Sequence, residues 1–152
     1  MKKTNRFAAL LLTLVMILTV IPMNAISSIA VSASDFTEPT IFVDSKYSAA
    51  GSTVTVDVAI ANNPGIAGAT LTVAYDQLLT LTAAANGEAF SNLTFTKPGS
   101  FSNPSRFLWD SESGETKKDG TILTLTFEVS ESASSDANLN IEISSNLGDF
   151  YD

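Results

Sequence analysis

The chain has 152 residues, with 8 basic and 16 acidic side chains and no histidine or cysteine, a length that suits one domain plus a short appendage. Without cysteine it can form no disulfide scaffold, thiol nucleophile or cysteine-ligated metal site. Without histidine it can form no serine–histidine–aspartate triad and none of the usual histidine zinc sites, so a carboxylate pair is the one hydrolytic mechanism left open.

The first 33 residues have the pattern of a secretory signal peptide. Three cations lie within residues 1–6, an apolar stretch covers residues 7–21, and Val31-Ser32-Ala33 supplies the small residues that a signal peptidase reads. The apolar stretch is shorter than the roughly 20 residues that a membrane-spanning helix needs. We therefore expect cleavage after Ala33 and a secreted domain, extracellular or associated with the cell surface, that covers residues 34–152.

Loss of the leader removes three of the 8 cations and none of the 16 acidic residues, which leaves a net charge near −11. Nucleic acids and anionic membrane surfaces are poor partners for so acidic a chain. The partner of the mature domain is therefore expected to be neither of these.

Eight short runs that alternate between apolar and polar residues follow the leader, and each predicts a β-strand. In chain order they are Ile41–Val43, Thr53–Ile60, a run within 63–76 that ends at Tyr75, Leu78–Thr82, Leu93–Thr96, Arg106–Asp110, Thr121–Val129 and Asn138–Ser144. Outside the leader, no window has helical periodicity. The pattern predicts an all-β fold, an antiparallel β-sandwich.

The outward faces of these strands differ in charge. Asp57 and Glu128 lie among threonines on the second and seventh strands, as is typical of faces in contact with water. On the third strand Leu71, Val73 and Tyr75 form the apolar face. The opposite face of that strand is small and uncharged, and it consists of Gly68, Thr70, Thr72 and Ala74.

The sixth strand exposes a leucine if its two aromatic residues, Phe107 and Trp109, point inward. Leu108 then lies outward between Arg106 and Asp110. An apolar residue surrounded by polar ones on a flat sheet is typical of a protein-binding patch, although single exposed leucines are also common.

Two further motifs have ordinary structural explanations. Residues 110–120 carry clustered carboxylates, but the fifth position of this candidate calcium loop is Gly114 and the twelfth is Thr121, so a solvated turn is favoured. Nothing in the sequence sets a working separation for a glycosidase pair, so we expect no catalysis. The carboxylates considered for that pair are Asp76, Asp110, Glu112 and Asp119.

Five groups of segments occur in an order and spacing that match one known family. They are Gly51–Val56, Asn63–Gly68 with Tyr75-Asp76, Phe107–Asp110, Asp119–Leu123 and Leu125–Phe127. Together they resemble the cohesin domain of cellulosome scaffoldins, from about Thr40 to Asp152. The resemblance implies a nine-stranded jelly-roll sandwich without catalytic activity. It also implies a partner, the calcium-loaded dockerin of a polysaccharide-degrading enzyme or of another scaffold subunit, which carries the calcium, so no cofactor is expected on this chain.

The resemblance also implies a docking face on the sheet of strands eight, three, six and five. Carried over by position, the partner-binding residues are Gly68, Thr70, Thr72, Ala74, Leu108, Asp110, Ser111, Glu112, Gly114, Asn140 and Glu142. Thr72, Ala74 and Leu108 would form a near-flat apolar centre. The acidic residues and Asn140 would accept hydrogen bonds at the rim.

The family normally ends with a ninth strand that pairs with the first, whereas this chain ends soon after its predicted eighth. We therefore expect a domain truncated at its C-terminus, with the first strand as an unpaired edge. The alternative function is a carbohydrate-binding module of similar fold, which needs exposed aromatic rings, whereas Trp109 and Tyr75 are predicted to lie inward. A second alternative is an adhesion or surface-layer sandwich, in which Leu108 and Thr72 contribute nothing to affinity.

Overall fold

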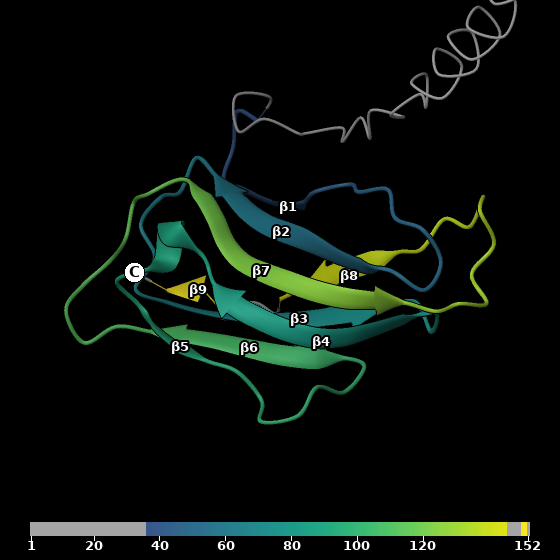
Figure 1. Ribbon diagram of the computed structural model, residues 1–152. Coiled ribbons are helices and arrows are strands. Elements are labelled where there is room, and N and C mark those ends of the chain that lie inside the picture. Colours follow the sequence, from purple (N-terminus) through teal and green to yellow (C-terminus); the bar gives the residue numbers. More distant parts are fainter. Residues whose placement is uncertain (1–35, 146–149, 152) are drawn as a thin grey trace, which may run out of the picture.

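The computed structural model describes residues 36–145 and 150–151, so the predicted signal peptide over residues 1–33 lies outside them (Figure 1). No helix within these residues is long and apolar enough to cross a membrane. The described elements are β1 (Thr40–Val43), β2 (Thr53–Ala61), β3 (Gly68–Tyr75), β4 (Leu79–Asn86), the 3₁₀ turn η2 (Glu88–Phe90), β5 (Thr94–Thr96), β6 (Ser105–Asp110), β7 (Gly120–Val129), β8 (Ile141–Ser144) and β9 (Phe150–Tyr151).

The strands form two antiparallel sheets that pack face to face (Figure 1). One sheet has the order β1-β2-β7-β4, and the other has the order β5-β6-β3-β8 with β9 also paired to β3. Pairing of β2 with β7 in one sheet and of β3 with β6 in the other is the nested pattern of a jelly roll. The predicted all-β, antiparallel, jelly-roll sandwich is confirmed.

Side chains from both sheets fill one core between the layers. Phe107 and Phe127 are 0% exposed and Trp109 is 2% exposed, as their alternation predicts. The Trp109 ring packs edge-on against Phe90, with ring centroids 5.6 Å apart. Its Nε1–H donates a hydrogen bond of 2.8 Å to Oδ1 of Asn86. The buried rings of Phe107 and Trp109 therefore hold β6 against the core.

Some strand boundaries differ from the predicted ones. β4 continues to Asn86 instead of ending at Thr82, because a bulge between Leu81 and Ala83 shifts the alternation and lets pairing with β7 continue. β8 begins at Ile141, three residues after the predicted start, since the preceding residues form an irregular loop. Neither η2 nor β9 was predicted, because both are too short to show periodicity.

The last part of the chain lies along β3. β8 pairs with residues 72–75 and β9 with residues 68–69. On the other sheet β1 pairs with β2, and no other described strand pairs with it. Val43, Val54 and Ile141 are only half-buried, and a cavity of about 780 Å³ lies against them. The core is less well covered on this side of the sandwich.

Gly87 leads into η2 where no larger residue fits. Its N–H donates a hydrogen bond of 3.0 Å to the Ile122 carbonyl, and a Cβ at this position would overlap the backbone carbonyl of Thr121. We expect Gly87→Ala to lower the free energy of unfolding by about 1–3 kcal/mol, measured by urea denaturation. The matched control is Gly99→Ala, since a Cβ at Gly99 meets nothing within 4 Å. Equal midpoints for the two variants would contradict this account.

Candidate functional site

The outward face of the β5-β6-β3-β8 sheet carries most of the residues predicted to bind a partner. On β3, Leu71 and Val73 are 1% and 0% exposed and lie in the core. Thr70, Thr72 and Ala74 alternate with them and are partly exposed on the other side. The predicted division of β3 into an apolar inner face and a small, uncharged outer face is correct for these residues.

Leu108 is the largest apolar side chain on the outer face of β6. It is 41% exposed, because its neighbours Phe107 and Trp109 fill the core on the other side of the strand. Arg106 and Asp110 are exposed on the same side as Leu108, two residues before and after it. The arrangement expected from the sequence, a leucine between two opposite charges, is present.

Threonines flank Leu108 on both neighbouring strands. Leu108 is opposite Thr70 of β3 and opposite Thr96 of β5. Cβ atoms of directly opposite residues are about 4.5–5.5 Å apart. The centre of the face is therefore one leucine between two short side chains that carry methyl groups, a surface flat enough for another secondary-structure element to pack on.

A second row crosses the sheet next to this centre. Arg106 is opposite Thr72 of β3, and Thr72 is opposite Ser144 of β8. One step further along β3, Ala74 is opposite Glu142, which is exposed. A positive and a negative group thus lie on the same face, in adjacent rows.

The Asp110 end of the face differs in one respect from the predicted site. Asp110 is opposite Gly68 of β3 and Thr94 of β5. Gly68 is buried, and its backbone also pairs with Tyr151 of β9. Gly68 therefore offers a partner little surface, because it has no side chain and strands lie on both sides of it.

The loop that follows β6 is a solvated turn, as predicted. The Ser113 N–H donates a hydrogen bond of 3.1 Å to Oγ of Ser111, and Glu112 is exposed. Gly114 has φ of 113°, a conformation that favours glycine. Among the residues with described positions, no three acidic side chains are grouped so that they could hold a metal ion.

Two of the carboxylates considered for catalysis hold turns together. Asp119 accepts hydrogen bonds from the N–H groups of Asn62 and Asn63, at 3.1 and 2.8 Å. Asp76 Oδ1 accepts a hydrogen bond of 2.8 Å from the Leu78 N–H. Both carboxylates therefore have backbone-capping roles.

Asn140 lies at the opposite end of the face from the Ser111–Gly114 loop. It is exposed just before β8, and its carbonyl accepts a hydrogen bond of 3.0 Å from the Asp76 N–H. The β3 segment between the two ends, from Gly68 to Ala74, spans roughly 20 Å at the usual rise per residue. The predicted residues thus form an elongated surface and not a compact pocket.

Four outward-facing residues of this face were not predicted from the sequence as part of the site. They are Thr94 and Thr96 of β5, Arg106 of β6 and Ser144 of β8, all exposed. The alternation of the fifth strand, in which Phe95 packs against the core, could have revealed the two threonines. Arg106 and Ser144 lie in one row because β6 and β8 both pair with β3, and the local sequence does not predict the register of these pairings.

Lysines near this face are engaged within the chain. Lys117 Nζ lies 2.6 Å from Oε1 of Glu115, and this exposed pair raises the pKa of Lys117 through the hydrogen bond and the charge of the carboxylate. Lys97 Nζ donates a hydrogen bond of 2.8 Å to the Ala84 carbonyl. Arg106 differs from both, since it forms no ion pair with any residue whose position is described.

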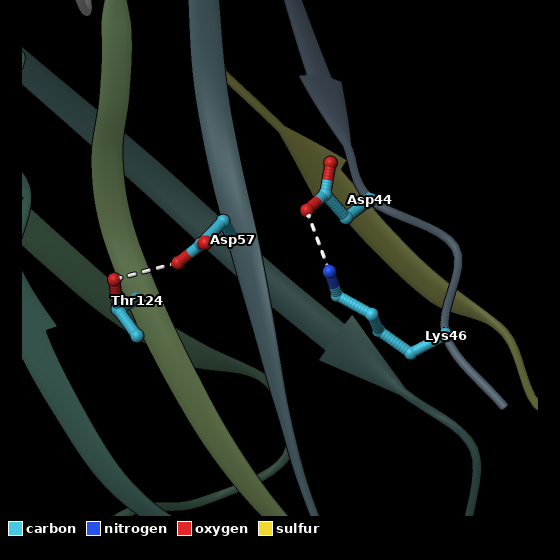
Figure 2. A network of polar contacts seen from close by, with 4 residues as sticks. All are labelled: Asp44, Lys46, Asp57 and Thr124. Atoms are coloured by element: carbon cyan, nitrogen blue, oxygen red, sulfur yellow. Dashed lines mark hydrogen bonds and ion pairs between the residues drawn. The ribbon is translucent and has the colours of Figure 1, made fainter. Parts of the chain in front are cut away.

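The outward face of the other sheet is more conventional. Figure 2 shows that Thr124 Oγ1 donates a hydrogen bond of 2.7 Å to Oδ1 of Asp57 across β7 and β2. Near the end of β1, Lys46 Nζ lies 3.1 Å from Oδ2 of Asp44. The polar groups drawn there have partners within the chain, so the face that exposes Leu108 is the better candidate for binding a partner.

Three solved structures illustrate what this chain is similar to. A cohesin from scaffoldin B of Acetivibrio cellulolyticus, in complex with a mutant dockerin, has 24% identity and a TM-score of 0.60 over 72% of this chain and 83% of that chain. A type III cohesin from a cellulosomal, cell-surface anchoring scaffoldin of Ruminococcus flavefaciens has 17% identity and a TM-score of 0.65 over 80% and 77%. A non-cellulosomal cohesin from the archaeon Archaeoglobus fulgidus has 22% identity and a TM-score of 0.55 over 70% and 77%.

These structural likenesses agree with the β-sandwich fold described above. A comparison with curated proteins gives no match. Residues 39–150, well over half of the chain, match the cohesin domain family. The family match and the sheet order therefore agree with the resemblance seen in the sequence, and the chain belongs to the cohesin domain family.

Proposed function

We propose that this domain is a non-catalytic recognition module that binds dockerin domains and so assembles a polysaccharide-degrading complex of the cellulosome type. The observation that carries the proposal is the exposed Leu108 between Thr70 and Thr96, on a flat sheet face of a cohesin-family domain. A similar cohesin from Acetivibrio cellulolyticus was solved with a dockerin, which supports the same class of partner.

The dimensions of the face suit a helix. A face roughly 20 Å long matches about 13 residues of α-helix, whose diameter of about 10 Å covers two neighbouring strands. Leu108 would be buried at the centre, while Glu142 and Glu112 at the rim would accept hydrogen bonds from basic or hydroxyl side chains of the helix. Affinity would then come from the apolar centre and specificity from the rim.

The sugar-binding alternative has little support on the described surface. Tyr47 is 66% exposed, but Trp109 is buried and Tyr75 packs against Phe127 with ring centroids 5.2 Å apart. One exposed ring does not make the stacking platform that a polysaccharide chain needs. Protein recognition is therefore preferred to carbohydrate binding.

The proposed module acts outside the cell. The N-terminal pattern supports export and cleavage after Ala33, and the mature domain begins at Ser34. Its acidic character suits basic groups on a protein partner. The N-terminal residue of the secreted protein, read by mass spectrometry, tests this part of the proposal.

Calcium removal is expected to abolish the interaction, because the metal orders the partner and not this chain. The experiment is calorimetric titration of residues 34–152 with a panel of dockerins, in calcium and then in EDTA, beside pull-downs on cellulose and xylan. We expect saturable binding to at least one dockerin in the presence of calcium and none in EDTA. We expect neither cellulose nor xylan to retain the domain. Retention on polysaccharide without binding to any dockerin would favour a carbohydrate-binding module instead.

A further inference from the structure

We infer that Arg106 selects the partner: the docking helix places a carboxylate over Arg106, Thr72 and Ser144, one helical turn from the apolar residue that covers Leu108. This inference rests on the proposed function and deepens it by naming a feature of the partner. It follows from the place of Arg106 in the sheet, from the lack of an ion pair between Arg106 and any residue with a described position, and from the chemistry of its neighbours.

Arg106 lies close to the apolar centre of the docking face. Arg106 is exposed on β6, two residues before Leu108, so the two Cα atoms are about 7 Å apart along the strand. Its row continues through Thr72 to Ser144, both short hydroxyl side chains. Among the described outward positions of these four strands, Arg106 is the one cation. A helix that covers Leu108 must also cover this charge.

Among the residues with described positions, no acidic side chain forms an ion pair with Arg106. Lys46, Lys117 and Lys118 each form an ion pair, and Lys97 donates to a backbone carbonyl. Arg106 has neither kind of contact among the described residues, although the chain is strongly acidic overall. A partner that covers Arg106 without offering an acceptor would therefore bury an unpaired charge, which is costly.

The chemistry of Arg106 and its neighbours suits a carboxylate. A guanidinium group presents five N–H donors in a planar fork, which a carboxylate accepts through two parallel hydrogen bonds. The Thr72 and Ser144 hydroxyls can donate to the same carboxylate from the side. On a helix, residues three or four apart have Cβ atoms about 5–6 Å apart, close to the Arg106–Leu108 spacing. The partner is therefore expected to carry an acidic and an apolar residue at that separation.

Charge reversal tests the inference. With the dockerin that binds best, Arg106→Glu is expected to weaken binding about 30-fold or more and Arg106→Gln about 10-fold. Each carboxylate of the partner's docking helices is then changed singly to lysine, and one of these changes should restore binding to Arg106→Glu while weakening binding to the unchanged protein. The matched control, Lys46→Glu, makes the same change of net charge near β1 of the other sheet and should bind normally.

The possible failures of the inference and of the proposed function are distinguishable. If the unchanged protein binds a dockerin and Arg106→Glu binds it equally well, the inference is overturned and the proposed function stands. If Arg106→Glu weakens binding but no charge change on the partner restores it, the inferred direct pair between Arg106 and a carboxylate of the partner is overturned, and the proposed function stands. If no dockerin binds the unchanged protein in calcium, both are overturned. Thermal unfolding of each variant checks that the domain remains folded, which is expected because Arg106 is exposed.

Discussion

Leu108→Asp is expected to abolish dockerin binding while leaving the domain folded. Leu108 is 41% exposed at the centre of the β5-β6-β3-β8 face, so it contributes more to a docked partner than to the core. Aspartate would remove this apolar contact and bury an unpaired carboxylate against the helix. Loss of a central apolar residue of this kind costs about 2–4 kcal/mol, roughly 30- to 1,000-fold in affinity.

Calorimetric titration with a dockerin measures this loss, and Leu108→Ala should give a smaller one. The matched control is Ala85→Asp, which adds a carboxylate to an exposed position of β4 on the other sheet and should bind normally. The free energy of unfolding of each aspartate variant should lie within about 1 kcal/mol of that of the unchanged protein, because both positions face water. Unchanged affinity of Leu108→Asp would place the docking surface elsewhere and favour the adhesion alternative.

Trp109→Ala is expected to produce the largest loss of stability. The Trp109 ring is 2% exposed, lies 5.2 Å from the Phe95 ring by centroids, and donates a hydrogen bond to Asn86. Its removal leaves a cavity beneath β6 and an unpaired amide oxygen on Asn86. The expected cost is about 3–5 kcal/mol, a large part of the 5–15 kcal/mol that stabilises a typical domain.

Urea denaturation followed by far-UV circular dichroism measures this loss, because Trp109 is the one tryptophan in the chain and its fluorescence disappears with it. Trp109→Phe retains a ring but removes the donor to Asn86, and should cost an intermediate amount, about 1–3 kcal/mol. A midpoint for Trp109→Ala close to that of the unchanged protein would show that the ring does not support the sheet.

The directions of side chains were predictable where alternation is unbroken. On β6 the predicted inward residues Phe107 and Trp109 are both buried. The reason is local, since every second side chain of a strand points to the same face. In β4 a bulge after Leu81 interrupts the alternation, so the predicted end at Thr82 is earlier than the observed end at Asn86.

The candidate site was predictable in its residues but not in its arrangement. The exposed Leu108 and the uncharged face of β3 follow from the sequence pattern, and the choice of the sheet face as a docking surface came from the resemblance to cohesins. The rows that join Leu108 to Thr96, and Arg106 to Thr72 and Ser144, depend on strand register. Register between distant segments reflects the packing of the whole core, which no short window of sequence contains.

The sequence by itself determined the class of the fold, the inward and outward faces of most strands and the exclusion of histidine and cysteine chemistry, because these depend on composition and on a period of two residues. The tertiary structure alone decided that Gly68 is buried between neighbouring strands and that Arg106 shares a row with Ser144. These features depend on which strands lie side by side and in what register. That choice is made by burial of one common core, in which segments far apart in the chain must fit together.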